Sequence, residues 1–341
     1  MGKMKFLVIG LGSMGRRRIR CLQYLGEKDI IGFDIRKDRY EETEKKYGIK
    51  TFSDFNEACG QNPNVFIISV PSNLHHFYAM EAVKRNKHFF TESNFLPEGI
   101  DDLVKVEKEG KIICVPSFTM PHHPSVKIMR SGIEEGKIGK VYSFTYHLSS
   151  YLPEWHPWED YRDVYYGKKE TPGSKEMVAF ELTWIVWLLG RVQEVCAFKS
   201  KMSSLEIEFE DTYQIILKLK NGVLGHLLID VASLPSGRNM KILGEKGTFC
   251  WNSEEEIIKW FNTEKRKWEE IKGDKGIEEA GYSVHTHEEM YIEEMENFVK
   301  TVRGEKKYPY TFTQEKHIID ILVAIEQSIS QKIVMEVEDE V

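Results

Sequence analysis

A short apolar strand that runs into a glycine-rich turn constrains this chain more than any other feature. Residues 5–9 read Lys-Phe-Leu-Val-Ile, and Gly10, Gly12 and Gly15 follow in the spacing Gly-x-Gly-x-x-Gly. A periodic segment over 16–25 completes the order strand, tight turn, helix. In this pattern the first glycine allows the turn, the second lets the backbone approach a pyrophosphate, and the third lets the helix pack closely on the strand. The pattern predicts a dinucleotide-binding βα unit.

An acidic residue at the end of the next expected strand supports this interpretation. Residues 29–34 end in Asp34, near the offset of about 20 residues at which a carboxylate binds the adenine ribose. Asp34 favours NAD, because a carboxylate repels the 2′-phosphate of NADP. Arg36 could pair with that phosphate. A solvated surface charge explains Arg36 equally well, so NADP stays open as the cofactor.

Composition and charge predict an ordinary globular protein of two domains. The chain has 341 residues, of which 41% are hydrophobic and 30% charged. Its net charge of −7 argues against nucleic acid as a partner, and we expect the basic run Arg16–Arg18 to be a solvated helix face. No apolar stretch approaches the roughly 20 residues that cross a bilayer, and no signal peptide is recognisable, so a cytoplasmic protein is expected. The five scattered cysteines lack metal-ligand spacing, which predicts no metal site.

Strands and helices alternate along the first 120 residues. Further apolar runs lie at 65–70, 87–92 and 111–116. This alternation predicts an α/β fold with a doubly wound parallel sheet, a Rossmann domain over 1–120. Ligands of such sheets bind past the carboxyl ends of the strands. The cofactor-binding residues expected there are Gly10, Gly12, Ser13, Met14, Gly15, Asp34, Arg36, Ser69, Pro71, Asn73, His75 and Glu92.

Beyond residue 120 the pattern changes to long strands that follow one another closely. These strands lie between 192 and 262, after an aromatic-rich loop and an apolar helix over 176–189, and helices are expected at 285–302 and 314–330. The pattern predicts a large open sheet, mixed or antiparallel. We expect a second, α+β domain over 121–341.

An ordered set of motifs along nearly the whole chain resembles one protein family. The motifs are Gly10–Gly15, Val70–His75, Asn86–Glu92, His123–Pro124, Gly132–Gly139, Trp187–Gly190 and Gly244–Thr248. They resemble the glucose–fructose oxidoreductase / inositol dehydrogenase / MocA (Gfo/Idh/MocA) family. The resemblance implies hydride transfer between NAD or NADP and a hydroxyl or carbonyl of a sugar, cyclitol or nucleotide sugar. It also implies a homodimer or homotetramer, because the open sheet of the family commonly pairs subunits face to face.

The sequence departs from this family at both proton-transfer positions. The family uses a lysine in a Glu-Lys-Pro motif and an Asp-x-x-x-His pair before Trp-Leu-Leu-Gly. The first motif reads Glu92–Ser93–Asn94 here, and the pair becomes Glu176 and Phe180. A serine hydroxyl and a phenyl ring cannot exchange protons near neutral pH as lysine and histidine do. General acid–base help is worth roughly 10²–10⁴ in rate, so hydride transfer without it would be slow.

Several polar residues near these positions are candidate replacements. The catalytic candidates are Glu92, Ser93, Glu176, Lys175 and His147, and the candidate substrate contacts are His123, Tyr161, Arg162 and Glu181. Aromatic residues over 146–166 suit the face of a sugar, and an arginine could clamp a carboxylate or phosphate. A loop pinned into the core by its tryptophans explains the same residues equally well.

Three functions therefore stay open. The first is an oxidoreductase with relocated proton-transfer groups. The second is a cofactor-binding member of the family that has lost dehydrogenase activity and serves as a partner subunit or a sensor. The third is a non-redox reaction that uses tightly held NAD transiently.

Overall fold

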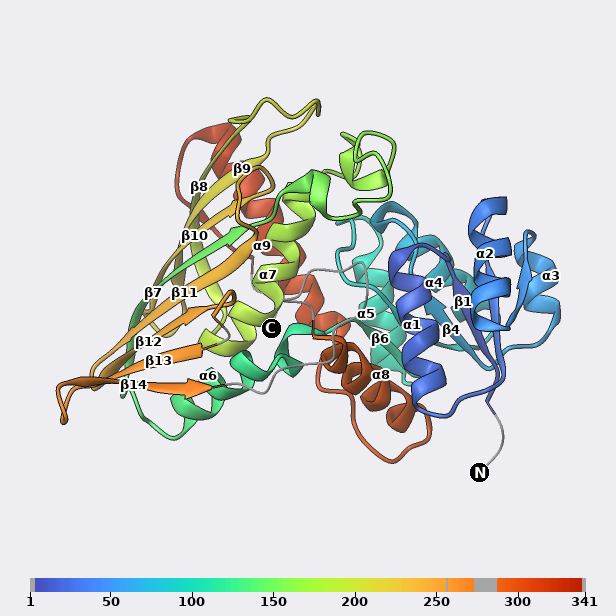
Figure 1. The fold of residues 1–341 in the computed structure, drawn as a ribbon, viewed down its shortest axis with the longest axis horizontal. Coiled ribbons are helices and arrows are strands. Elements are labelled where there is room, and N and C mark those ends of the chain that lie inside the picture. Colours follow the sequence, from blue (N-terminus) through green and yellow to red (C-terminus); the bar gives the residue numbers. More distant parts are fainter. Residues whose placement is uncertain (1–3, 256, 273–286, 339–341) are drawn as a thin grey trace. The chain divides into compact units, whose positions relative to one another are not determined.

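The computed structural model describes residues 4–255, 257–272 and 287–338, and the chain divides into two compact units (Figure 1). The first unit comprises Met1–Thr119 and Glu289–Lys316, and the second comprises Met120–Glu288 and His317–Val341. This division corrects the prediction of a second domain that is continuous over 121–341. The segment Glu289–Lys316 belongs to the first unit because its side chains pack there, as the rings of Phe90 and Phe298 do at 5.5 Å.

The first unit contains a six-stranded parallel sheet, which confirms the predicted Rossmann fold. Its strands are β1 (Phe6–Ile9), β2 (Ile30–Phe33), β3 (Lys50–Phe52), β4 (Val65–Ile68), β5 (His88–Thr91) and β6 (Cys114–Pro116). The order is β3-β2-β1-β4-β5-β6, and every neighbouring pair is parallel. The order reverses between β1 and β4, where doubly wound sheets bind their ligands.

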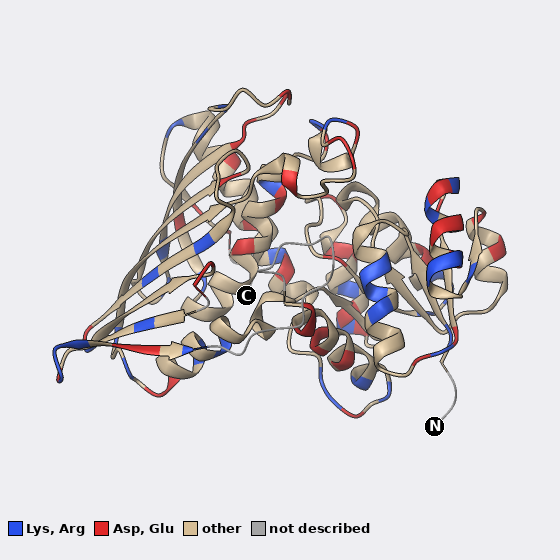
Figure 2. Cartoon of the chain, in the orientation of Figure 1, with Lys and Arg blue, Asp and Glu red and all other residues tan. Residues whose placement is uncertain are grey.

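The first unit also contains helices, most of which bury apolar side chains. They are α1 (Ser13–Tyr24), α2 (Lys37–Tyr47), α3 (Phe55–Gly60), α4 (His75–Lys84), α5 (Ile100–Glu109) and α8 (Glu288–Val302). Basic residues gather on α1 (Figure 2). Two of them depart from the expected solvated face, since Arg17 and Arg18 are only 3% and 0% exposed.

The second unit contains a nine-stranded mixed sheet. Its strands are β7 (Val141–Ser149), β8 (Val192–Ser200), β9 (Thr212–Leu219), β10 (Leu224–Asp230), β11 (Gly237–Gly244), β12 (Gly247–Asn252), β13 (Ile257–Asn262), β14 (Lys267–Lys272) and β15 (Met335–Glu336). The order is β14-β13-β12-β11-β7-β10-β9-β8-β15, and among the strand pairs of the described residues only β7 and β10 are parallel. The predicted open sheet is thus confirmed, with β14 and β15 as additions that the sequence did not predict.

One face of the nine-stranded sheet is covered by helices and the other is open. The helices α6 (Pro124–Glu134), α7 (Gly173–Leu189) and α9 (Phe312–Gln331) lie on the covered face (Figure 1). Side chains alternate along β7, so Phe144, Tyr146 and Leu148 are buried toward the helices. No helix among the described residues of this unit covers the opposite face.

The described residues give no sign of a membrane span or a metal centre. No described helix is long and apolar enough to cross a bilayer. Within the described ranges no three histidine, cysteine or acidic side chains gather as metal ligands would. All five cysteines are free thiols.

Candidate functional site

The turn after β1 has the geometry of a phosphate cradle. Gly10 has φ of +87°, and a Cβ there would lie 2.5 Å from the carbonyl oxygen of Ser69. A Cβ on Gly15 would lie 1.8 Å from the carbonyl oxygen of Gly10. Gly12 is the N-cap of α1, so no side chain caps this helix and its first turn carries no acid. Uncapped N–H groups and the positive end of the helix dipole suit a diphosphate, and Ser13 and Met14 lie in this first turn.

The carboxylate of Asp34 lies beside the cradle at the end of β2. It is 6% exposed, and its two oxygens accept hydrogen bonds from the backbone N–H groups of Leu11 (2.7 Å) and Arg36 (2.8 Å). These bonds fix the acid beside the glycine turn, where a ribose hydroxyl would reach it. The Arg36 guanidinium instead binds both carboxylate oxygens of Asp38, at 3.2 and 2.6 Å, on an exposed surface. This arrangement favours the surface-charge interpretation of Arg36.

The guanidinium of Arg39 also lies against the cradle, and sequence reasoning missed it. An ideal Cβ on Gly12 would lie 3.3 Å from Nη1 of Arg39. The only signal in the sequence was a basic residue in the helix that follows Asp34, and such residues are too common on helices to indicate a ligand site. Its position suits an anionic ligand on the glycine turn.

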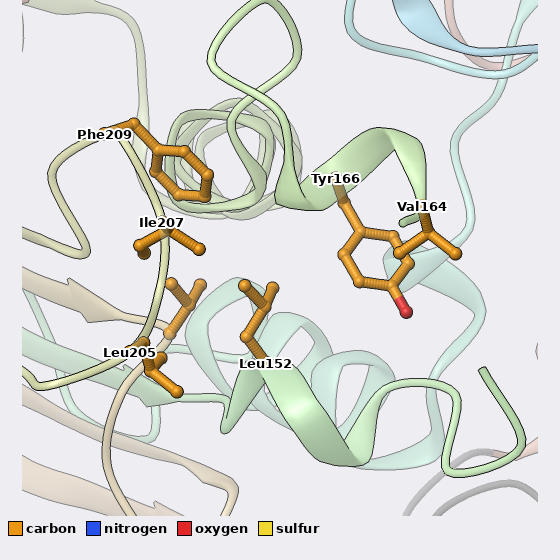
Figure 3. Close-up of a cluster of buried hydrophobic side chains, with 7 residues drawn as sticks. Leu152, Val164, Tyr166, Leu205, Ile207 and Phe209 are labelled. Atoms are coloured by element: carbon orange, nitrogen blue, oxygen red, sulfur yellow. The ribbon is translucent and has the colours of Figure 1, made fainter. Parts of the chain in front are cut away.

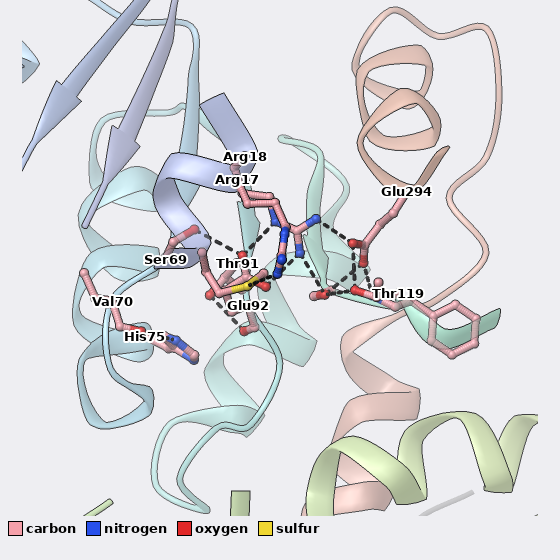
Figure 4. Close-up of polar contacts among 12 residues, drawn as sticks. Arg17, Arg18, Ser69, Val70, His75, Thr91, Glu92, Thr119 and Glu294 are labelled. Carbon is pink, nitrogen blue, oxygen red and sulfur yellow. Dashed lines mark hydrogen bonds and ion pairs between the residues drawn. The ribbon is translucent and has the colours of Figure 1, made fainter. Parts of the chain in front are cut away.

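The loop after β4 places its polar groups at the carboxyl end of the sheet. Asn73 is exposed in the short helical turn that follows Pro71. His75 is 2% exposed, and its Nε2 lies 2.8 Å from the carbonyl oxygen of Val70 (Figure 4). Burial lowers the pKa of His75 to about 4, so the neutral ring donates to that carbonyl and supports the loop from within.

Glu92 is held by a buried arginine (Figure 4). Nε and Nη2 of Arg18 each lie 2.8 Å from one oxygen of the Glu92 carboxylate. The hydroxyl of Ser69 donates to Oε1 of Glu92 at 3.1 Å. Glu92 therefore takes part in a bidentate ion pair, which fixes the direction of its carboxylate and suits it to position a ligand. Ser93, the next residue, is 7% exposed.

Glu176 is the candidate with the surroundings of a proton-transfer group. It lies in the first turn of α7. Although other parts of the residue are partly exposed, its Oε2 is buried and has no hydrogen-bond partner. Burial raises the pKa of Glu176 to about 8, and a side-chain hydrogen bond with Tyr165 acts in the opposite direction. Its neighbour Lys175 extends to Glu326, with Nζ 3.8 Å from Oε1, so this lysine serves an ion pair with α9.

His147 lies on the open face of the nine-stranded sheet, opposite α7. Its neighbours Tyr146 and Leu148 point to the helices, so alternation along β7 directs His147 the other way. Its Nε2 lies 2.9 Å from Oδ2 of Asp230. The sheet therefore separates His147 from Glu176, and the two cannot act on one substrate within this subunit.

Both oxygens of the Glu181 carboxylate accept hydrogen bonds from side chains within the second unit. The carboxylate is fully buried, with Oε2 2.6 Å from both the Tyr146 hydroxyl and Nε1 of Trp184. Oε1 accepts two hydrogen bonds from Arg238, at 3.1 and 2.7 Å. Glu181 therefore links α7 to the sheet, and none of its surface is exposed to a substrate.

His123 is the N-cap of α6. Its Nδ1 accepts a hydrogen bond from the backbone N–H of Ser125 at 3.2 Å, and the ring packs against Trp251 and His287. Burial, assisted by His287 and Arg238, holds the pKa of His123 well below its usual range. The neutral ring therefore stabilises the start of the helix.

The aromatic loop between β7 and α7 is pinned by its own small core (Figure 3). This core consists of Leu152, Val164, Tyr166, Leu205, Ile207, Phe209 and Val231. The Tyr161 hydroxyl accepts a hydrogen bond from the backbone N–H of Glu206 at 3.1 Å. Arg162 is bound to Asp160 and Glu206. Both side chains therefore have partners within the loop region, which favours the pinned-loop interpretation over a sugar platform.

Comparison with known proteins gives relatives that match the chain over its full length. The myo-inositol 2-dehydrogenase of Thermotoga maritima is 24% identical over 98% of this chain and 99% of that protein. A levoglucosan dehydrogenase solved with NADH has 17% identity and a TM-score of 0.85, covering 99% of this chain and 100% of the other. The WlbA dehydrogenase of Bordetella pertussis, solved with NADH and UDP-GlcNAcA, has 20% identity and a TM-score of 0.79 over 99% of this chain and 100% of the other. These structures share the fold.

Two family models match adjoining parts of the chain. The oxidoreductase family with an NAD-binding Rossmann fold matches residues 4–118, and the GFO/IDH/MocA C-terminal domain matches residues 126–250. The order of the two matches agrees with that of the parallel sheet and the mixed sheet described above, and the second match ends within β12, before the strands β13, β14 and β15. The chain therefore belongs to the GFO/IDH/MocA family of oxidoreductases, and its parallel sheet is the family's NAD-binding Rossmann domain.

Proposed function

We propose that this protein oxidises a hydroxyl of a sugar or cyclitol with NAD, or reduces the matching carbonyl with NADH. The glycine turn would hold the diphosphate and Asp34 the adenine ribose. Ser69, Asn73 and Glu92 lie at the carboxyl ends of β4 and β5, where the rest of a dinucleotide would bind. NAD, when bound, supplies the acceptor for the hydride. The sugar class follows from the activities named for the relatives, which act on myo-inositol and levoglucosan.

Glu176 is assigned as the general base that accepts the proton of the substrate hydroxyl. The assignment rests on the surroundings of this carboxyl group. Its Oε2 is buried without a hydrogen-bond partner, and the pKa of the group is raised to about 8. A carboxyl with this pKa can accept a proton from the hydroxyl and release it again near neutral pH. Ser93 and Phe180 cannot, and Glu92 is bound to Arg18. Glu176 thus replaces the lysine and histidine that the family uses.

The proposal is tested by mixing the purified protein with NAD and a panel of cyclitols, anhydrosugars, free sugars and UDP-sugars. Formation of NADH is followed by absorbance, and binding of NADH is measured separately by calorimetry. Turnover of at least one polyol above the rate without protein is the expected result. Bound NADH with no turnover of any of them would contradict it.

A cofactor-binding protein without dehydrogenase activity is the second candidate. The replacement of the family's lysine and histidine by Ser93 and Phe180 favours it. On this hypothesis the wild type binds NADH but transfers no hydride, and Ser93→Lys combined with Phe180→His gains activity. Any turnover by the wild type excludes this candidate.

Replacing Asp34 by asparagine should shift cofactor preference toward NADP. The change removes the charge that repels a 2′-phosphate and weakens a charge-assisted hydrogen bond worth about 1.5–3 kcal/mol. We expect the ratio of NADPH to NADH affinity to rise at least about tenfold, measured by fluorescence titration. Glu41→Gln is the matched control, because this acid lies on the exposed face of α2. An unchanged ratio of NADPH to NADH affinity would show that Asp34 does not bind the adenine ribose.

The open face of the nine-stranded sheet is proposed as the surface that pairs two subunits. Exposed apolar side chains lie along it, among them Phe198 (72%), Ile216 (57%) and Leu224 (54%). Charged residues are most frequent on β14 (Figure 2), and a concavity of about 380 Å³ opens on this face, where its lining includes His147, His226, Lys241 and Lys259. An uncovered apolar face of this extent is typical of an interface.

Replacing Ile216 by lysine should therefore dissociate the oligomer. The new charge would be buried against a second sheet, which costs several kcal/mol when the charge has no partner. Light scattering after size exclusion should give a dimer or larger for the wild type and a monomer for the variant. Ile35→Lys, at an exposed site of the first unit, is the control and should keep the wild-type mass. A monomeric wild type would contradict the proposal.

A further inference from the structure

A buried glutamate of α8 holds the loop that follows β6. The carboxylate of Glu294 is fully buried and accepts hydrogen bonds from the hydroxyls of Ser117 and Thr119, each at 2.8 Å, and from the backbone N–H of Phe118 (Figure 4). It also binds Nη1 of Arg18 at 2.6 Å. Because the same guanidinium binds Glu92, α8 contributes to the position of the Glu92 carboxylate.

A second buried glutamate, at the start of α9, holds the loop that follows β5. Oε1 of Glu315 accepts the backbone N–H of Asn94 at 3.0 Å, and Oε2 accepts the Tyr310 hydroxyl at 2.9 Å. Glu315 is 1% exposed, and burial raises its pKa to about 7. The two residues that it joins are 221 positions apart in the sequence.

The backbone at Asn94 takes a conformation that depends on this residue type. Its φ is +71°, which asparagine tolerates better than most residues. Proline, the residue of the family motif at this position, fixes φ near −65° and has no N–H to donate. The hydrogen bond to Glu315 therefore requires a residue other than proline at position 94.

Ser93 is thus fixed from both sides. Glu92 before it is bound by Arg18, and Asn94 after it is bound by Glu315. The loop lies at the carboxyl end of β5, the edge at which doubly wound sheets bind dinucleotides. A shift of the loop by even an ångström would misplace groups that contact a ligand there.

We propose that Glu315 is a positioning residue of the cofactor site, which holds the loop Glu92–Asn94 in the conformation that binds the dinucleotide. Glu294 is a positioning residue for the Glu92 carboxylate, because it binds the same Arg18 guanidinium. The inference rests on the proposed function only in requiring that this unit binds NADH, and not on any dehydrogenase activity.

Three variants of the full chain test it by NADH calorimetry and by hydrogen exchange of the Asn94 amide. Glu315→Leu removes the acceptor, and we expect a Kd for NADH at least about tenfold higher with faster exchange of that amide. Glu315→Gln keeps an acceptor oxygen and should bind NADH within about twofold of the wild type. Glu296→Gln, at a partly exposed glutamate of α8 that pairs with Lys300, is the control.

The outcomes separate the positioning role from the function of the site. A Glu315→Leu protein that is less stable yet binds NADH as the wild type does would overturn the inference, because its role would then be structural only. If that variant does not fold, Asn94→Pro against Asn94→Gly replaces it, since glycine keeps both the N–H and the positive φ. We expect weakened binding in the proline variant alone, and equal binding in both would overturn the inference. A wild type that does not bind NADH would overturn the cofactor assignment itself.

Discussion

Replacement of Glu176 by glutamine should lower kcat/KM for polyol oxidation by about 10²–10⁴, the usual value of a general base. Glutamine has nearly the same shape but cannot accept the proton. The wild-type rate of oxidation should rise with pH until the carboxyl is ionised near pH 8, and the rate of carbonyl reduction should fall over the same range. The variant should lose both dependences. The measurement is steady-state kinetics of both oxidation and reduction across this pH range.

Stability provides an independent test of the same carboxyl. Its pKa is raised from 4.5 to about 8 on folding, so the folded protein holds the proton more tightly than the unfolded chain does. The wild type should therefore lose stability as pH rises from about 4.5 through 8, and Glu176→Gln should lose less. Glu170→Gln, at an exposed site, should match the wild type in rate and stability. Equal pH profiles for the wild type and Glu176→Gln would exclude Glu176 as the base.

Gly15→Ala should abolish NADH binding and destabilise the first unit. The new Cβ would lie 1.8 Å from the carbonyl oxygen of Gly10, a backbone atom that cannot move without opening the turn. We expect a loss of NADH affinity of more than about 100-fold, or no soluble protein, because overpacking against backbone costs several kcal/mol. Calorimetry with NADH and thermal unfolding measure the two effects.

The matched control for this variant is Gly60→Ala. Gly60 ends α3, and no atom lies within 4 Å of a Cβ built there. Alanine favours the helix by up to about 1 kcal/mol over glycine, so this change should be neutral or slightly stabilising. A Gly15→Ala protein that binds NADH like Gly60→Ala would show that the turn does not hold the diphosphate.

The Rossmann half was predictable because its signals are local. The strand, the glycine spacing and Asp34 lie within 30 residues, and the positive φ of Gly10 and the short contact at Gly15 are physical requirements that only glycine meets. The alternation of apolar runs likewise predicted the parallel sheet. The open sheet followed from long strands with period two, although β14 and β15 were missed because they are short or highly charged.

The candidate site was predicted less well, because residue type does not reveal direction or partner. His147 and Glu181 both looked like site residues. Strand alternation directs the first to the open face, and three internal donors occupy the second. Arg17 and Arg18, expected in solvent, are buried.

Short motifs identify the family and the cofactor domain and reveal the missing lysine and histidine, since each motif consists of residues close together in the chain. Packing of the chain leaves one oxygen of Glu176 buried without a hydrogen-bond partner, and it brings Glu294 and Glu315 to the loops after β6 and β5. Burial and hydrogen bonding between residues up to 221 positions apart arise only when the chain packs, and these set the protonation and position of the groups that act.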